Sequence, residues 1–238
     1  MKKILSLIIC VVAFAGMANA QQNQTVTSGS DHTYTANPQA GTTADHYVWQ
    51  LVDGADVAVI DLTGETGVTL AINWDAVNFT VGQTYRLKSQ VVDDNACISE
   101  AVYVDVTIAA EAFVNFAAAA TNVITCSDLN GGVSGGLADQ SLFELAFTGG
   151  VGPFEVTYEI RDASNAVVQG PTTVPNLNNG DDLTINNNFV NETGADVDYT
   201  VVITAAKTND GADVTVNADN SRTITVHTKP VITNLTLN

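Results

Sequence analysis

Apolar and polar residues alternate with a period of two along most of the chain, in short runs separated by glycine, asparagine, aspartate and proline. The clearest runs are residues 68–74, 85–91, 102–108, 143–147, 155–160, 199–205 and 222–226. A period of two places successive side chains on opposite faces of a strand, and the residues between the runs favour turns. We therefore predict an all-β fold of antiparallel β-sandwiches.

The first twenty residues have the pattern of a secretory signal peptide. Lys2 and Lys3 precede an apolar run of about 13 residues, and the small-polar-small sequence at 18–20 follows it. That run is too short for a membrane-spanning helix, which needs about 20 residues. We predict that residues 1–20 direct Sec-dependent export and are removed, and that the mature chain has no transmembrane segment. The expected location is extracellular, at the cell surface, or periplasmic.

The composition is strongly acidic, with 26 Asp and Glu residues against 8 Lys and Arg residues and a formal net charge of −18. Such a chain repels phosphate backbones, so we expect no nucleic-acid partner. Hydrophobic residues make up 45% of the chain and charged residues only 14%. This proportion is sufficient for a packed core, and disorder over the whole chain is not expected.

The first half carries a set of short motifs with regular spacing, in residues 47–50, 64–74 and 82–85, followed by the turn Asn95-Ala96-Cys97. Together they resemble the PKD-like Ig-type domain of Bacteroidota surface proteins, over roughly residues 40–109. In that family a Y-x-W strand crosses the core and a G-x-Y strand leads to a turn with a cysteine. The resemblance implies an Ig-like sandwich with Trp49 and Trp74 in its core.

The second half resembles another Ig-like repeat of the same kind of protein, in Cys126, the Gly-Pro-aromatic turn and strand of residues 149–158, and the strand of residues 199–203. The resemblance implies two tandem Ig-like antiparallel β-sandwich domains of gliding or adhesin type. We place the first at residues 21–109 and the second at 123–238. Residues 110–122 are either a linker or the first strand of the second domain.

The resemblance also implies a disulfide within each domain, but each predicted domain keeps only one cysteine, Cys97 or Cys126. Neither has a partner within its own domain. Two unpaired thiols, a bridge between Cys97 and Cys126, and a bridge between molecules all remain open, although export permits a disulfide.

No catalytic constellation stands out, and we predict that the protein is not an enzyme. Residues 132–136 match G-x-S-x-G around Ser134, but they lie in a glycine-rich loop and not in the strand–turn–helix that a nucleophile elbow needs. His32, His46 and His227 are scattered without metal-ligand spacing.

Acidic residues gather in the predicted turns, at residues 93–95, at 181–182, and at Asp210, Asp213 and Asp219. Loop carboxylates are the ligands that Ca²⁺ prefers, so the last three are a candidate calcium site. The alternative is that these are solvated turn residues, because Asp favours turns for conformational reasons. We expect no other cofactor.

A strand-like segment, residues 231–238, follows the second predicted domain, and its apolar residues are Val231, Ile232, Leu235 and Leu237. It either folds back onto its own domain or adds to a sheet edge of another subunit. Residues 21–28, at the start of the first predicted domain, are also extended but have no predicted role in it.

Taken together, these features predict a non-enzymatic extracellular or envelope protein with a structural or adhesive role. It would act through protein partners, as a homo-oligomer or in a cell-surface complex, and as a filament subunit if strand addition joins its copies. The alternative is a carbohydrate- or calcium-binding accessory module. That alternative requires exposed aromatic residues, whereas we expect Tyr47, Trp49, Trp74 and Tyr85 to fill the core.

Overall fold

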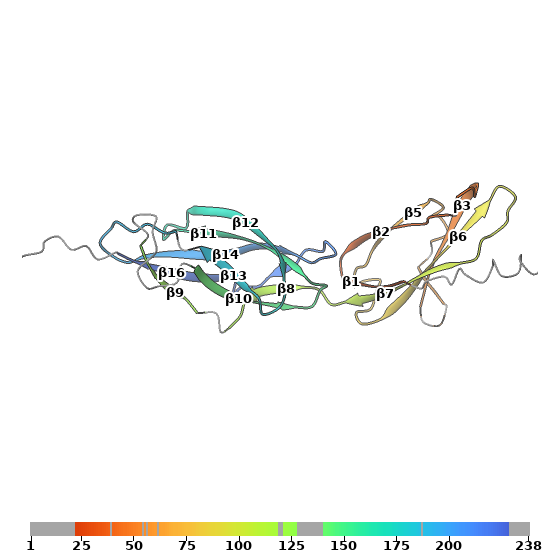
Figure 1. The fold of residues 1–238 in the computed structure, drawn as a ribbon. Helices are drawn as coiled ribbons and strands as arrows, with labels where there is room; N and C mark the ends of the chain where they lie inside the picture. The colour runs from red at the N-terminus through yellow and green to blue at the C-terminus, as the bar shows by residue number, and fades with distance from the viewer. Residues whose placement is uncertain are drawn as a thin grey trace, which may run out of the picture. The chain divides into compact units, whose positions relative to one another are not determined.

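The computed structural model describes residues 22–38, 40–53, 55, 57–60, 62–118, 121–127, 140–186 and 188–228. These residues form strands β1 to β16 and no helix, so the predicted all-β fold is confirmed (Figure 1). They divide into two compact units. Within the described residues, the first unit contains 22–26 and 31–108, and the second contains 27–30 and 109–228.

The first unit is a two-layered sandwich. Its strands are β1 (Gln22–Thr27), β2 (Asp31–Thr35), β3 (Ala44–Val52), β4 (Ala58–Ile60), β5 (Thr69–Asn73), β6 (Thr84–Asp93) and β7 (Val102–Ala109). One sheet has the order β1-β7-β6-β3-β4, and the other pairs β2 with β5. The N-terminal residues that the sequence left unassigned therefore form an edge strand beside β7.

Aromatic side chains dominate the first core. Trp74 is fully buried, Trp49 and Tyr85 are nearly so, and Phe79 packs between Trp74 and Tyr85. The Trp49 indole Nε1 donates to the Gly67 carbonyl at 2.9 Å, and the Thr80 amide donates to the Tyr85 hydroxyl at 2.8 Å. A buried Trp on the third strand and a Tyr hydroxyl bonded to upstream backbone are both hallmarks of Ig-like sandwiches.

The second unit repeats the plan with longer strands. They are β8 (Phe113–Phe116), β9 (Val123–Cys126), β10 (Gln140–Thr148), β11 (Phe154–Arg161), β12 (Val167–Leu177), β13 (Asp182–Asn186), β14 (Val197–Lys207), β15 (Thr215–Val216) and β16 (Ser221–His227). One sheet has the order β12-β11-β14-β16-β9, with β9 parallel to β16. The other has the order β13-β10-β8-β15.

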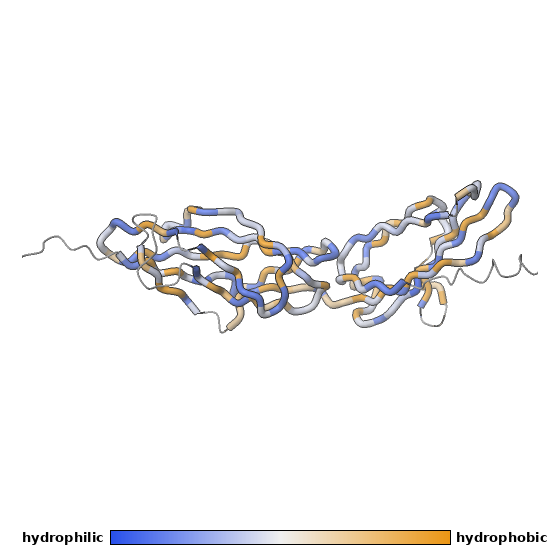
Figure 2. Tube along the Cα trace, viewed as in Figure 1, coloured by the Kyte–Doolittle hydropathy of each residue, from blue (hydrophilic) through white to orange (hydrophobic). Residues whose placement is uncertain are grey.

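The second core is built from phenylalanine and aliphatic residues, with Phe116, Phe143, Leu145, Leu183 and Ile203 completely buried. Along β10 and β13 every second side chain is buried, and Figure 2 shows the same alternation of hydrophilic and hydrophobic residues along the strands. This alternation is the period-two pattern of the sequence, because each sheet presents one face to the core and one to solvent.

The glycines of the sequence motif at 149–158 serve a close approach of the backbone. Both Gly149 and Gly150 have positive φ, +70° and +68°. A Cβ on Gly149 would lie 2.0 Å from the Glu111 carbonyl oxygen, and one on Gly150 would lie 2.6 Å from the Ala112 Cβ. Only glycine fits both the conformation and the space. The turn then places Phe154 in the core, stacked on Phe147 with centroids 4.2 Å apart.

The two units have corresponding strand orders. Strands β10, β11, β13 and β14 of the second unit correspond to β2, β3, β5 and β6 of the first. In the first unit β2 pairs with β5 in one sheet and β3 with β6 in the other; in the second unit β10 pairs with β13 and β11 with β14 in the same way. This crossing of sequence neighbours between two sheets is the Ig-like arrangement, as the sequence predicted. Strands β5 and β13 also share a sequence pattern, Leu70-Ala71-Ile72-Asn73 and Leu183-Thr184-Ile185-Asn186.

Candidate functional site

Asp210 lies in the β14–β15 turn of the second unit and is held by hydrogen bonds to its neighbours. Its carboxylate accepts from the Thr27 amide at 2.5 Å and from the Thr27 hydroxyl at 2.9 Å. The Thr208 hydroxyl donates to the same carboxylate at 2.5 Å. Thr27, which the contacts group with the second unit, is fully buried, and its hydroxyl also accepts from the Val151 amide.

The electrostatics of Asp210 follow from these contacts. Burial alone would raise the pKa of its carboxyl, but the hydrogen bonds from Thr208 and Thr27 outweigh burial and hold the pKa below its usual value. A carboxylate that accepts several hydrogen bonds is stabilised in its charged form. Asp210 is therefore an anionic hydrogen-bond acceptor that fixes residues 27–30 and the 208–212 turn.

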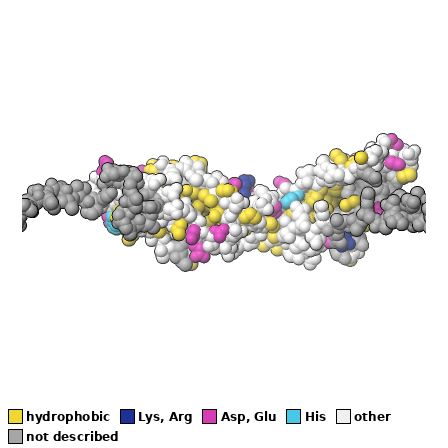
Figure 3. All heavy atoms as spheres, viewed as in Figure 1, with side chains coloured by type: hydrophobic (Ala, Val, Ile, Leu, Met, Phe, Trp, Pro, Cys, Tyr) yellow, Lys and Arg dark blue, Asp and Glu magenta, His cyan; other side chains and the backbone are white. Residues whose placement is uncertain are grey.

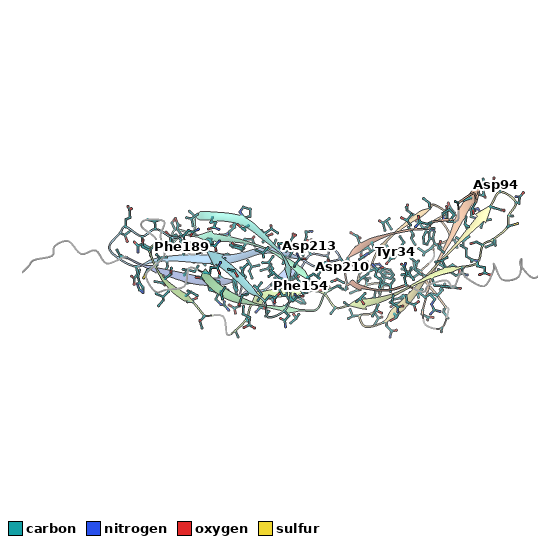
Figure 4. All side chains as sticks on the ribbon, viewed as in Figure 1. Tyr34, Asp94, Phe154, Phe189, Asp210 and Asp213 are labelled. Carbon is teal, nitrogen blue, oxygen red and sulfur yellow. The ribbon has the colours of Figure 1, made fainter. Side chains whose placement is uncertain are left out.

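The other two candidate calcium ligands have basic partners. Asp213 is exposed and lies 3.2 Å from the Lys207 Nζ. Asp219 receives two hydrogen bonds from the Arg222 guanidinium, at 2.5 and 3.0 Å, and these hold the pKa of Asp219 below its usual value. In Figure 4 Asp210 and Asp213 lie at the opposite end of the second unit from Phe189.

A metal centre is not evident in the part of the chain that the structure describes. Within it, no group of three or more His, Cys, Asp or Glu residues is placed to hold a metal ion. Asp210 and Asp213 share a turn, but the first bonds to Thr27 and the second to Lys207. Calcium binding at these residues stays a prediction.

The acidic residues of the hairpin turns shape the turns themselves. Asp93 accepts hydrogen bonds at its Oδ1 from the amides of Asn95 and Cys97, at 2.9 and 2.8 Å. Asp162 does the same for Ser164 and Ala166, at 2.8 and 3.0 Å. These are Asx-type turns, in which a side chain satisfies backbone donors that the reversal of the chain leaves unpaired.

The three histidines each have a different environment. His46 lies 2.8 Å from Asp45, His227 lies 2.5 Å from Asp196, and His32 lies 3.3 Å from the Gln24 amide nitrogen. A shallow cavity of about 260 Å³ runs along β3, and its lining includes His46, Tyr47, Trp49, Gln50, Glu65 and Thr66. This cavity is a shallow surface groove of the first unit.

The aromatic residues belong mainly to the cores. Trp49, Trp74, Tyr85 and Tyr158 are all at most 7% exposed. Tyr47 and Tyr199 are half-buried and pack against the cores. Burial raises the pKa of Tyr34 to about 12, and the ring of Tyr34 meets Trp74 edge-on within the first unit (Figure 4). These rings lie in or against the cores, and among them Tyr47 also lines the cavity on β3.

Cys97 and Cys126 both carry free thiols in the structure. Cys97 is exposed in the turn that Asp93 stabilises, and Cys126 is half-buried at the end of β9, beside His227 of β16. Ser134, residues 1–20 and residues 231–238 lie outside the described residues, so the signal peptide, the G-x-S-x-G match and the C-terminal segment remain sequence-based predictions. No helix among the described residues is long and apolar enough to cross a membrane.

The sheet edges are the remaining candidates for binding. β12 ends one sheet of the second unit, but it contains Pro171 and Pro175 and its register against β11 shifts at three points. Proline lacks an amide donor, and irregular register disrupts a pairing surface, so β12 is a protected edge. β13 ends the other sheet and has a continuous five-pair register with β10, no proline and no lysine.

Strand β13 was not among the strands predicted from the sequence, although a signal for it was present. Residues 182–186 alternate polar and apolar side chains over five positions. However, aspartate and asparagine residues lie on both sides of the run, and such residues favour a loop. The structure shows that this run closes one side of the second core, with Leu183 and Ile185 fully buried.

Comparisons with known proteins find similarity at the level of structure. No protein-family model and no curated protein sequence matches the chain. Fibronectin(III)-like modules of Clostridium thermocellum CbhA align over 89% of this chain and 92% of theirs, with 15% identity and a TM-score of 0.38. An I-band fragment of titin, I67–I69, aligns over 88% of this chain and 63% of its own, with 12% identity and a TM-score of 0.31.

The N-terminal four Ig domains of Dscam1 isoform 9.44 align with 15% identity and a TM-score of 0.26, and the match spans 89% of this chain but 44% of that one. The structural neighbours are thus tandems of fibronectin III and Ig-like domains. At these TM-scores none of them informs the function of this chain.

Proposed function

We propose that this chain is an exported, non-enzymatic structural or adhesive protein of the cell envelope, and that its copies join through strand addition by residues 231–238. The observation that supports this function most strongly is that each sandwich is filled by its own side chains, while in the described part of the chain the edge strands of its sheets pair on one side only. A module of this kind interacts through its surfaces and edges.

The packing of the cores supports the first part of the proposal. Trp74, Phe116, Phe143 and Leu145 are each less than 2% exposed. Interiors that are filled by interlocking side chains leave no enclosed space for a small substrate. Among the described residues, the shallow groove on β3 and the sheet edges are features that reach the surface.

The surface composition supports protein partners. Apolar side chains lie exposed on strands, with Ile124 of β9 at 57%, Leu142 of β10 at 54% and Val102 of β7 at 53%. Figure 3 shows hydrophobic and acidic side chains interspersed on the visible face. With a net charge of −18, long-range repulsion between copies has to be overcome by close, uncharged contacts, and backbone pairing at a strand edge provides such contacts.

The experiment that tests the proposal is the mass of the chain in solution. The protein from Gln21 onward, with and without residues 231–238, is measured by light scattering after size exclusion, with negative-stain images. We expect oligomers or filaments of the longer protein and monomers of the shorter one. N-terminal sequencing of the exported protein is expected to begin at Gln21.

A matched control uses single substitutions in the segment. Leu235→Asn removes an apolar side chain and is expected to weaken assembly, whereas Thr236→Asn, on the opposite side of an extended strand, is expected to leave it intact. Monomers of the full protein over a wide concentration range would overturn self-assembly, and with it the strand-addition part of the proposal.

The groove on β3 favours a second candidate function, binding of carbohydrate. Tyr47 offers a ring, and Gln50 and Glu65 offer polar groups, which is the combination that holds a sugar. A rise in melting temperature with an oligosaccharide, lost in Glu65→Ala and retained in Glu155→Ala of the second unit, would support it. Absence of any shift across a panel of glycans would exclude it.

A further inference from the structure

We propose that the open edge of β13 is the acceptor for residues 231–238 of a second copy of the chain. The inference rests on the proposed self-assembly and names the surface that receives the added strand. It is carried by the direction of the β13 backbone groups, the regularity of β13, the lack of a second pairing strand beside β13 among the described residues, and the sequence pattern and charge of residues 231–238.

The backbone groups of β13 show which residues face the open edge. The Leu145 amide of β10 donates to the Asp181 carbonyl at 2.9 Å, immediately before β13. Backbone groups alternate in direction along a strand, and the register continues without a break from Asp182 to Asn186. The amides and carbonyls of Leu183 and Ile185 therefore point toward β10, and those of Asp182, Thr184 and Asn186 point toward the open edge.

The side chains of β13 complete an acceptor surface. Leu183 and Ile185 are fully buried in the core, whereas Asp182, Thr184 and Asn186 are exposed. An added strand would extend both faces of this sheet, one apolar and one polar. Among the described residues no strand pairs with β13 on the side away from β10.

The corresponding strand of the first unit, β5, differs in its surroundings. Its backbone faces its own edge in the same way, because the Ala36 amide donates to the Val68 carbonyl just before the strand. However, the residues that precede β5 bond to β3: the Tyr47 amide donates to Thr66 and the Trp49 indole to Gly67. These bonds tie residues 62–67, the connection that leads into β5, to β3 of the other sheet.

In the second unit, a tight turn takes the place of residues 62–67. β12 leads to β13 through residues 178–181, where Asp181 accepts a hydrogen bond from the Asn178 amide at 2.7 Å and its own amide donates to the Asn178 carbonyl. Four residues close this turn, so none remains to run along β13. Before its strand, the first unit therefore has a connection of several residues that bonds to β3, and the second unit has only a four-residue turn.

The occupant is chosen by its sequence pattern. Residues 231–238 read Val-Ile-Thr-Asn-Leu-Thr-Leu-Asn, so an extended strand would place Val231, Thr233, Leu235 and Leu237 on one face and Ile232, Asn234, Thr236 and Asn238 on the other. From Asn234 to Asn238 this alternation matches the apolar and polar faces of β13. The segment is longer than the five residues of β13 and contains no proline or glycine.

Charge also favours this segment over other parts of the chain. Residues 231–238 carry no charged side chain, and β13 carries only Asp182. In a chain with 26 acidic residues, an uncharged strand is one that can approach an acidic edge without repulsion. A second copy supplies it at the same concentration as the acceptor.

The test places proline at the acceptor edge and at its counterpart. Thr184→Pro removes an amide that faces the open edge and leaves the pairing of β13 with β10 in place. Ala71→Pro is the matched control, because Ala71 occupies the equivalent exposed position of β5. Both variants are checked by circular dichroism, and Asn186→Pro, at the end of β13, serves if Thr184→Pro does not fold.

Two measurements are made on each variant. The first is the mass of the full chain by light scattering. The second is binding of a fluorescent peptide of residues 231–238 to the protein that ends at residue 230, followed by anisotropy. We expect Thr184→Pro to abolish oligomers and to weaken peptide binding by about tenfold or more, and Ala71→Pro to change neither.

The outcomes separate this inference from the proposed function. Oligomers that depend on residues 231–238 but survive both β13 prolines would overturn the β13 acceptor and leave the proposed self-assembly standing. A monomeric full chain whose shortened form binds the peptide at β13 would show that the segment folds back onto its own unit, which overturns both. Loss of assembly in Ala71→Pro alone would assign the acceptor to β5.

Discussion

The two units share a strand order but close one side of the sandwich in different ways. In the first unit, residues 62–67 bond to β3 through Thr66 and Gly67. In the second, four residues turn directly from β12 into β13, and Pro171 and Pro175 interrupt β12. The same topology therefore leads into its edge strand through a connection bonded to the opposite sheet in one unit and through a tight turn in the other.

The two cores teach a related lesson. The first relies on aromatic residues with polar groups, since Trp49 and Tyr85 each form a hydrogen bond to backbone. The second relies on phenylalanines that meet through their rings, such as Phe116 with Phe143 and Phe147 with Phe154. Both fill an Ig-like sandwich, so the fold constrains apolar volume and strand order more than residue type.

The largest expected difference between the units comes from truncating a ring in the second core. Phe143 is fully buried and packs edge-on against Phe116, with centroids 5.7 Å apart. Phe143→Ala is expected to lower the free energy of unfolding of the second unit by about 3–5 kcal/mol. Urea denaturation followed by far-ultraviolet circular dichroism measures this loss.

An internal control comes from the tryptophans, because both Trp residues of the chain lie in the first unit. Tryptophan fluorescence therefore reports the first unit alone, and its midpoint in urea is expected to stay unchanged in Phe143→Ala. If the fluorescence midpoint falls together with the circular dichroism midpoint, the two units unfold as one and the comparison fails.

The next effect concerns Asp210, for which the first unit has no counterpart among its described turns. Asp210→Ala leaves the buried Thr27 amide without its acceptor and leaves the Thr208 hydroxyl only the Ala212 carbonyl, at an expected cost of about 1–3 kcal/mol to the second unit. Asp210→Asn keeps one acceptor oxygen and should cost less. Urea denaturation at pH 7 measures both.

The pH dependence of this effect has a defined sign. The pKa of Asp210 is lower in the folded chain than its usual value, so its contribution is complete above that usual value. The contribution disappears as the pH falls through the folded pKa, when the carboxyl is protonated. The stability gap between wild type and Asp210→Ala should therefore close below about pH 4. A gap that persists at lower pH would show that shape, and not charge, matters.

A smaller effect on stability distinguishes Tyr85, near the start of β6, from Tyr199, near the start of β14. Tyr85→Phe leaves the Thr80 amide without its acceptor and is expected to cost about 1 kcal/mol. Tyr199→Phe keeps the stacking of the ring on Phe189, whose centroid is 4.6 Å away, and should cost less. Equal costs in urea denaturation would mean that the hydroxyl of Tyr85 contributes nothing specific.

Much of this fold was readable from period-two alternation. The strand predicted at residues 155–160 is β11 (Phe154–Arg161), and that at 222–226 is β16 (Ser221–His227). β12 escaped prediction because Gly170, Pro171 and Pro175 are turn residues by local preference. Here pairing with β11 outweighs local preference, since proline is tolerated on an edge strand.

The candidate site was less predictable, because it depends on contacts between residues far apart in sequence. Asp210 was a turn acid by sequence, and only the folded chain brings Thr27 to its carboxylate, 183 positions away. The acceptor role proposed for β13 likewise depends on which strands lie beside it. Composition and spacing carry no information about an edge that pairing leaves open.

The smallest expected effect tests whether the turn acids of the two units are equivalent. Hydrogen bonds from the Cys97 and Asn95 amides lower the pKa of Asp93 in the first unit, and hydrogen bonds from Ser164 and the Ala166 amide lower that of Asp162 in the second. NMR titration of the side-chain carboxyls should place both pKa values below the usual value for aspartate. Each turn then loses its stabilisation as the pH falls through these values.

The same samples test calcium binding by the two turns. Because these aspartates form the turns, we expect the amide resonances of residues 93–97 and 162–166 to show no saturable change on adding CaCl₂. A saturable change in one unit only would mean that one turn binds a cation and that the two turns, alike in their hydrogen bonds, differ in function.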